Sequence, residues 1–272
     1  MRKVAALFVL LPLIAFALSA RAQTVVQPAI DVDLELVLLV DISRSMSRDE
    51  LEIQRRGYAE ALSSPDVVES ITQGINGQIA LTYIEWAGRH TQRVIIDWTL
   101  IRNVADAKAF GDTLIAKFEG GMRMTSISRA LTFAASRFEG NGYRGLRRVI
   151  DISGDGPNND GPPVLPAREA VLEQGIVING LPLMTREGLG SYWDLKDLDQ
   201  YYLHCVVGGP GAFVVPVYSW DFFPLAVRRK LVLELAMPVF PPPEPRIIKA
   251  QAPGYDCLAG ENIWDRIIDN KN

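Results

Sequence analysis

The chain has 272 residues, of which 48% are hydrophobic and 22% are charged, and its formal net charge at pH 7 is −4. This length and hydrophobic content favour one large α/β domain with a smaller appendage. The acidic balance argues against a nucleic-acid partner, which would require a basic surface.

The first 22 residues have the layout of a secretory signal peptide. Arg2 and Lys3 precede an uncharged apolar run, and small residues around Ala22 offer a cleavage site after that residue. An uncleaved membrane anchor is the alternative, although the run is short for a membrane span and Pro12 interrupts it. No second long apolar run follows, so we expect no stable membrane insertion after cleavage, and a periplasmic or secreted location.

After a lead at residues 23–33, strand and helix patterns alternate as far as residue 236. The first strand, 34–40 (LELVLLV), is almost entirely apolar, as is typical of a strand buried on both faces. The short GRH connection between 77–87 and 91–100 predicts an antiparallel pair. The predicted strands are 34–40, 77–87, 91–100, 147–153, 175–183 and 211–217, and the predicted helices are 48–63, 103–118, 125–138, 164–174, 194–202 and 220–236. This order predicts a doubly wound, mostly parallel six-stranded sheet with one antiparallel edge strand and helices on both faces.

The region after residue 236 is too short for a second domain. We interpret residues 237–272 as a Pro-rich spacer followed by a C-terminal strap that docks back on the domain, with a free partner-binding tail as the alternative. The chain has two cysteines, Cys205 and Cys257. An even count in an exported protein favours a disulfide, and two unpaired thiols are the alternative.

Polar residues follow two of the predicted buried strands at their carboxyl ends, where ligands bind in parallel α/β sheets. Asp41, Ser43 and Ser45 (DISRS) come directly after the first strand, and Asp155 (SGDG) comes after the fourth. Thr125 starts a predicted helix after a Gly-Gly pair at 120–121. Their oxygens are hard ligands of the kind that Mg²⁺ and Mn²⁺ accept. The alternative for DISRS is a plain turn, because Asp and Ser side chains hydrogen-bond the nearby backbone.

These three segments, in this order, resemble the metal-ion-dependent adhesion site (MIDAS) of von Willebrand factor type A domains, and the order of elements from 34 to 236 is similar too. The chain also resembles a bacterial secreted family of unknown function within that superfamily. The resemblance implies that Ser43 and Ser45 bind Mg²⁺ or Mn²⁺ directly and that Thr125 binds directly or through water. It implies that Asp41 and Asp155 act mainly through water and hydrogen bonds.

Such a site leaves the cation under-neutralised, so that it attracts an acidic group from a protein or peptide partner. In related domains the closing helix shifts when the site engages a ligand, and a similar shift is a hypothesis for residues 220–236.

The sequence departs from the family pattern in two places. Arg44 lies between the two serines and would compete with the metal, and three residues separate Thr125 from the Gly-Gly pair. Asp151 lies inside a predicted buried strand, where it either bonds across the sheet or points into the site. We interpret Asn158 and Asp160 as ordinary loop polarity.

The sequence therefore predicts an exported, metal-dependent protein-binding module that is not an enzyme. His90 and His204 have no companion that would complete a zinc site, and no G-x-S-x-G elbow is present. The alternatives are a scaffold or assembly factor with an idle metal site, and a metal-assisted hydrolase.

Overall fold

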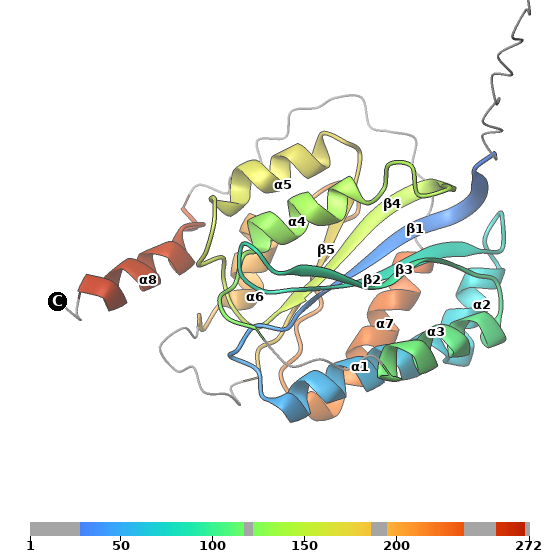
Figure 1. The fold of residues 1–272 in the computed structure, drawn as a ribbon, viewed down its shortest axis with the longest axis horizontal. Coiled ribbons are helices and arrows are strands. Elements are labelled where there is room, and N and C mark those ends of the chain that lie inside the picture. The colour runs from blue at the N-terminus through green and yellow to red at the C-terminus, as the bar shows by residue number, and fades with distance from the viewer. Residues whose placement is uncertain (1–27, 117–121, 186–194, 237–253, 270–272) are drawn as a thin grey trace, which may run out of the picture.

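A computed structural model describes residues 28–116, 122–185, 195–236 and 254–269 of the chain. These residues form a mixed sheet with helices on both of its faces (Figure 1). The predicted signal peptide at 1–22, residues 23–27 of the lead, and the Pro-rich spacer lie outside the described residues. None of the helices in the described ranges combines the length and apolar composition that a membrane span requires.

The sheet has five strands in the order β3-β2-β1-β4-β5. Their bounds are β1 Ile30–Asp41, β2 Ile79–Trp86, β3 Gln92–Ile101, β4 Tyr143–Gly154 and β5 Val177–Pro182. β1 pairs in parallel with β2 and β4, and β4 pairs in parallel with β5. β3 pairs antiparallel with β2 at the edge, as the short connection between them predicts.

The sixth strand predicted at 211–217 is not present as a strand. Val214 and Val217 make only isolated bridges, to Gly180 and Leu183. Both sides of this pairing contain a proline, Pro182 on β5 and Pro216 opposite, and proline has no N–H to give to a ladder. The segment therefore runs beside β5 with an interrupted set of backbone hydrogen bonds.

The helices fall close to the predicted positions, with two additions that the sequence analysis did not predict, α2 and α8. Their bounds are α1 Arg48–Leu62, α2 Pro65–Thr72, α3 Val104–Ala116, α4 Ile127–Ser136, α5 Val164–Leu172, α6 Leu198–Tyr201, α7 Phe223–Ala236 and α8 Ala259–Asp269. A π-helical segment, Tyr202–Val206, continues α6, and a 3-10 turn, Trp220–Phe222, precedes α7. α1 begins with a capping box, because Ser47 and Glu50 each accept a hydrogen bond from the other's backbone N–H.

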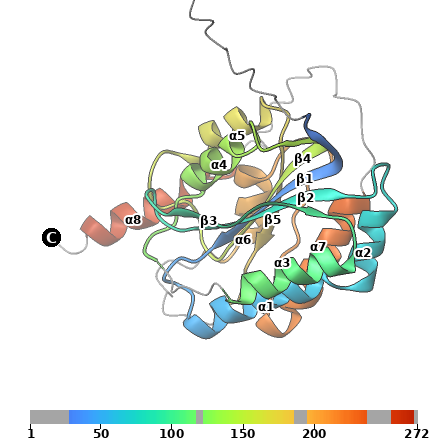
Figure 2. The same ribbon diagram turned by 45° about the vertical axis from the view of Figure 1, so that its right-hand side comes forward.

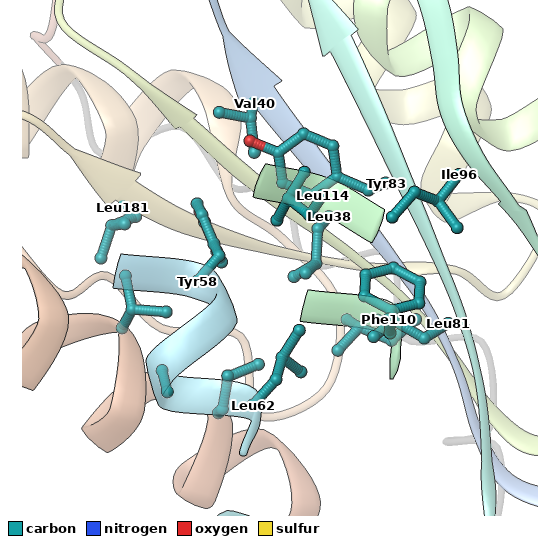
Figure 3. Packing of buried hydrophobic residues seen from close by; sticks show 14 of the residues in the cluster. Leu38, Val40, Tyr58, Leu62, Leu81, Tyr83, Ile96, Phe110, Leu114 and Leu181 are labelled. Atoms are coloured by element: carbon teal, nitrogen blue, oxygen red, sulfur yellow. The ribbon is translucent and has the colours of Figure 1, made fainter. Parts of the chain in front are cut away.

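The sheet separates two apolar layers, as Figures 1 and 2 show. On one face, α1, α2, α3 and α7 cover a cluster that includes Leu36 and Leu38 of β1. Figure 3 shows part of this cluster, in which Tyr58 of α1 lies near the strand residues. On the other face, α4, α5 and the α6 region cover a cluster that includes Val37 and Leu39. This alternation follows from the two-residue period of a strand and confirms that β1 is buried on both faces.

The C-terminal helix α8 is tied to the domain by a disulfide between Cys205 and Cys257, which are 5.5 Å apart between Cα atoms. The predicted pairing is therefore present. Asn158 Nδ2 donates a hydrogen bond of 2.8 Å to Glu261 Oε1 of α8, and Gly260 packs closely against the backbone of Asn158. The rest of α8 extends away from the sheet in both views (Figures 1 and 2).

Candidate metal centre

The carboxyl ends of β1 and β4 lie side by side, because the two strands pair in parallel with Val40 opposite Ser153. β1 ends at Asp41, and β4 ends at Gly154. The DISRS segment and Asp155 therefore leave the sheet at the same edge, although they are more than a hundred residues apart in the chain.

The DISRS segment is a turn held by its own aspartate. The backbone N–H of Ser43 donates a 2.6 Å hydrogen bond to Asp41 Oδ1, and the N–H of Met46 donates to the carbonyl of Ser43. The turn interpretation and the metal-site interpretation are thus compatible. The turn directs the Ser43 and Ser45 hydroxyls toward the end of β4, where both approach Asp155.

Three side-chain oxygens converge at this edge. Ser45 Oγ donates a 2.8 Å hydrogen bond to Asp155 Oδ1, and Ser43 Oγ lies 3.0 Å from Ser45 Oγ and 3.4 Å from Asp155 Oδ1. Ser43 is buried, whereas Ser45 and Asp155 are half-buried. Arg44, between the serines, is exposed, and in the described structure it makes no ion pair with Asp41 or Asp155. The group is therefore a small oxygen cluster that opens toward solvent.

Asp41 lies behind the cluster and is fully buried. Its second oxygen, Oδ2, has no hydrogen-bond partner within the described residues. Burial raises the pKa of Asp41 well above its ordinary value, and the nearby charge of Asp155 raises it further, against the hydrogen bond from the Ser43 amide. Burial also raises the pKa of Asp155 to about 6, against the hydrogen bond from Ser45.

The donor chemistry fits a hard divalent cation. Two desolvated carboxylates with raised pKa values and an unpaired carboxylate oxygen form a site that a positive charge would stabilise. Within the described residues there is no group of three or more His, Cys, Asp or Glu side chains placed to hold a metal. The candidate site therefore depends on the hydroxyls of Ser43 and Ser45 as well as on the carboxylates of Asp41 and Asp155.

Thr125 lies on a segment that is attached to both of these loops. The backbone N–H of Met122 donates to the carbonyl of Ile42, and Ser43 forms an isolated bridge with Met122. The N–H of Thr125 donates a 2.9 Å hydrogen bond to Asn159 Oδ1, and the N–H of Asn159 donates to the carbonyl of Thr125. In the described structure, no hydrogen bond joins the Thr125 hydroxyl to the other candidate ligands. The Gly-Gly pair at 120–121 lies outside the described residues.

The interpretation of Asn158 and Asp160, in the loop after Asp155, as ordinary polar loop residues is wrong. Both side chains are buried. Asn158 Oδ1 accepts from the N–H of Ser128 at the start of α4. Asp160 accepts from Arg89 through both the backbone N–H and Nε, each at 2.7 Å. These bonds fix the position of the loop that follows Asp155.

Asp151 is not part of the site. Its carboxylate forms an ion pair of 2.7 Å with Lys230 of α7, and both residues are buried. Neither possibility left open by the sequence is realised, because the carboxylate pairs with a helix that packs on the face of the sheet.

Comparison with known proteins shows the family and the fold. The family described as "Protein of unknown function (DUF1194)" matches residues 31–239. No curated protein matches the chain. Among solved structures, proximal thread matrix protein 1 from the mussel byssus, described with a zinc-occupied MIDAS motif, is 15% identical with a TM-score of 0.56, over 77% of this chain and 49% of that chain.

Two further structures show the same likeness. The pilus adhesin SpaC from Lactobacillus rhamnosus GG is 13% identical with a TM-score of 0.53, over 76% of this chain and 31% of that one. The von Willebrand factor type A protein from Catenulispora acidiphila is 13% identical with a TM-score of 0.50, over 74% of this chain and 42% of that one. This chain thus spans less than half the length of each of these three proteins.

At these identities the likeness shows the fold, and the predicted von Willebrand factor type A architecture is confirmed. The family match covers most of the chain. The protein therefore belongs to the DUF1194 family and has a fold of the von Willebrand factor type A kind.

Proposed function

We propose that this protein is an exported binding module that captures an acidic group of a protein or peptide partner through Mg²⁺ or Mn²⁺. The observation that carries the proposal is the convergence of Ser43, Ser45 and Asp155 within 2.8 to 3.4 Å at the open edge of the sheet. In this proposal Ser43 and Ser45 hold the cation directly, and Thr125 binds it directly or through water. Asp41 and Asp155 act mainly through water molecules of the cation.

The charge balance explains why such a site would bind an acidic partner. Neutral hydroxyls contribute no charge, and the two carboxylates act through water molecules and not by direct contact. The cation therefore keeps part of its positive charge. Mg²⁺ requires near-octahedral oxygen geometry and keeps waters in protein sites. An incoming carboxylate replaces one such water and supplies the missing negative charge. Because Ser45 and Asp155 are only half-buried, a macromolecule has access to that position.

The comparisons support the same class of function. The fold recurs in a protein described as a pilus adhesin and in a thread matrix protein described with a zinc-occupied MIDAS motif. The disulfide between Cys205 and Cys257 supports export, because disulfides persist in oxidising compartments. Together with the signal-like residues 1–22, it favours the periplasm or the cell exterior.

The first test is isothermal titration calorimetry of the oxidised chain lacking residues 1–22 with Mg²⁺ and with Mn²⁺. We expect saturable binding that is lost in Asp41→Ala and in Asp155→Ala. The control is Asp112→Ala, which removes an exposed carboxylate on α3 and should bind as the wild type does. Absence of binding in the wild type would contradict the proposal.

The second test concerns the partner. A partner identified by cross-linking in the native compartment should be retained by the wild type with Mg²⁺, and released by a chelator or by Asp41→Ala. Retention that is unaffected by the chelator would favour a scaffold with an idle metal site.

A further inference from the structure

Tyr202 is a buried residue at the candidate metal centre, and no sequence motif indicates it. Its side chain is fully buried, and its hydroxyl has no hydrogen-bond partner within the described residues. Asp41 Oδ2 is also buried and has no hydrogen-bond partner within the described residues. Two unpaired polar atoms in one buried region are costly unless they satisfy each other, because a polar group without a partner loses its hydration and gains nothing in return.

The two oxygens meet at Gly154, the last residue of β4. A methyl group on Gly154 would lie 2.7 Å from Tyr202 Oη and 2.9 Å from Asp41 Oδ2. Each of these distances is a hydrogen-bond length, so the two oxygens are no farther apart than two such lengths. That is a separation that one water molecule can bridge.

The sheet is shaped to admit this side chain. A methyl group on Gly180 of β5 would lie 2.8 Å from Tyr202 Cδ1. The ring edge of Tyr202 therefore packs against Gly180, and its hydroxyl packs against Gly154. The two glycines lie on neighbouring parallel strands, β4 and β5, with Gly180 opposite Ile152. A larger residue at either position would push the hydroxyl away from Asp41.

The backbone that carries Tyr202 is also unusual. Tyr202 begins the π-helical segment Tyr202–Val206, a rare geometry that occurs frequently at functional sites. Cys205 of the same segment forms the disulfide with Cys257. The segment is thus held in place from the C-terminal side of the chain as well as by packing.

The electrostatics agree with a donor role. Burial raises the pKa of Tyr202 well above its ordinary value, and Asp41 contributes the largest charge effect in the same direction. The phenol therefore keeps its proton at neutral pH, and it can donate to a carboxylate.

We propose that Tyr202 is a positioning residue whose Oη donates a hydrogen bond that reaches Asp41 Oδ2 through one water molecule. The bond fixes the orientation of Asp41, whose other oxygen holds the Ser43 turn, and so fixes the geometry of the oxygen cluster that receives the cation. This inference rests on the proposed function for its effect on metal binding, but the hydrogen bond itself is a property of the metal-free protein.

The test compares Tyr202→Phe with Tyr83→Phe. Tyr83 is a matched control, because its hydroxyl is also buried without a partner in the described structure, but it belongs to the apolar cluster on the other face of the sheet. We expect the Mg²⁺ dissociation constant to rise about tenfold or more in Tyr202→Phe, the range found when partners of ligating groups are removed, and to stay unchanged in Tyr83→Phe. The electron paramagnetic resonance spectrum of bound Mn²⁺ should change in Tyr202→Phe only, which loss of packing alone would not produce.

The outcomes separate this inference from the proposed function. If the wild type binds Mg²⁺ and Tyr202→Phe binds it equally well with the same Mn²⁺ spectrum, the positioning role of Tyr202 is wrong and the metal site stands. If the wild type binds no metal, the proposed function fails. A high-resolution crystal structure of the metal-free wild type then decides the inference: a single water molecule that links Tyr202 Oη to Asp41 Oδ2 supports it, and the absence of that link overturns it.

Discussion

Replacing Lys230 with methionine tests the buried charge cluster that joins α7 to the sheet. Lys230 Nζ lies 2.7 Å from Asp151 Oδ1 of β4 and also forms an ion pair with Glu234, and all three side chains are buried. Asn179 of β5 donates a hydrogen bond of 3.1 Å to Glu234 Oε1. Lys230→Met keeps most of the side-chain volume and removes the only ammonium that the described structure places against these two carboxylates.

The size of the effect follows from leaving buried carboxylates without their cation. Breaking a buried pair by removing one partner costs about 3 to 5 kcal/mol. Burial and the charge of Glu234 raise the pKa of Asp151 from 3.8 to about 7 even with Lys230 present. This rise corresponds to about 4 kcal/mol against the ionised form. We therefore expect Lys230→Met to lower the free energy of unfolding by about 3 to 5 kcal/mol at pH 8.

The effect should depend on pH in a definite direction. Because the folded-state pKa of Asp151 lies above the unfolded value, ionisation of Asp151 opposes folding, and stability falls as pH rises from about 4 to about 7. Lys230 lowers this pKa, so its removal extends the loss to higher pH. At pH 5.5 Asp151 is largely protonated in both proteins, and the difference between them should be smaller than at pH 8.

Urea unfolding followed by tryptophan fluorescence at pH 5.5 and at pH 8 measures both quantities. The control is Lys108→Met, which changes an exposed lysine on α3 and should alter stability by less than about 0.5 kcal/mol. A loss in Lys230→Met that is no larger than in the control, or that is equal at the two pH values, would contradict this prediction.

Three further predictions concern the site and the strap. Because burial raises the pKa of Asp155 to about 6, protons compete with the cation, and calorimetry should show the Mg²⁺ affinity falling between pH 7.5 and pH 5. A Mg²⁺ affinity that does not change with pH would exclude Asp155 from the site. A methyl group on Gly88 would lie 2.9 Å from the carbonyl oxygen of Arg123, so Gly88→Ala should displace the segment that carries Thr125 and weaken Mg²⁺ binding. An unchanged Mg²⁺ affinity would show that Thr125 does not contribute to the site. Replacing Cys205 and Cys257 with serine opens a loop with a sequence separation of 52, so the double variant should lose up to about 4 kcal/mol of stability. Its amide hydrogens in α8 should also exchange faster than in the wild type. Equal exchange would show that other contacts hold this helix.

The sequence predicts the central strands well, because burial on both faces demands nearly continuous apolar runs such as β1. It also predicts that Asp41 and Asp155 share an edge, since parallel pairing of β1 and β4 brings their carboxyl ends together. Element ends are less secure. The predicted helix 48–63 ends close to where α1 does, but Pro65 begins a further helix, α2, at a position where a missing N–H costs little.

The features that sequence missed depend on contacts between distant segments. Asn158 is polar and follows a strand, and nothing local indicates that its side chain bonds the start of α4 and Glu261 of α8. Tyr202 carries a clearer indication than Asn158 does, because a buried tyrosine usually has a hydrogen-bond partner. The position of its hydroxyl depends on glycines of β4 and β5, which become neighbours only in the folded sheet.

The closing helix α7 is anchored just before its first turn and near its middle, which bears on whether it shifts when the site engages a ligand. At its start, Trp220 Nε1 donates a 2.7 Å hydrogen bond to Glu50, which caps α1 just after the DISRS turn, and the charge of Glu50 contributes to the raised pKa of Asp155. Further along, Lys230 is paired with Asp151 of β4, the strand that ends at Gly154, just before Asp155. A shift of α7 along its axis would separate this pair and meet the cost of about 3 to 5 kcal/mol that such separation carries.

The binding of a ligand can drive that shift only if its affinities for the two positions of α7 differ by a comparable amount. We therefore expect α7 to stay in place when Mg²⁺ alone is bound. The check is hydrogen exchange of residues 220–236 in the wild type and in Lys230→Met, with and without Mg²⁺. Equal protection of the wild-type helix in both conditions, together with metal-dependent exchange in Lys230→Met, would identify the buried ion pair as the restraint. A metal-induced change already present in the wild type would show that the ion pair does not hold α7.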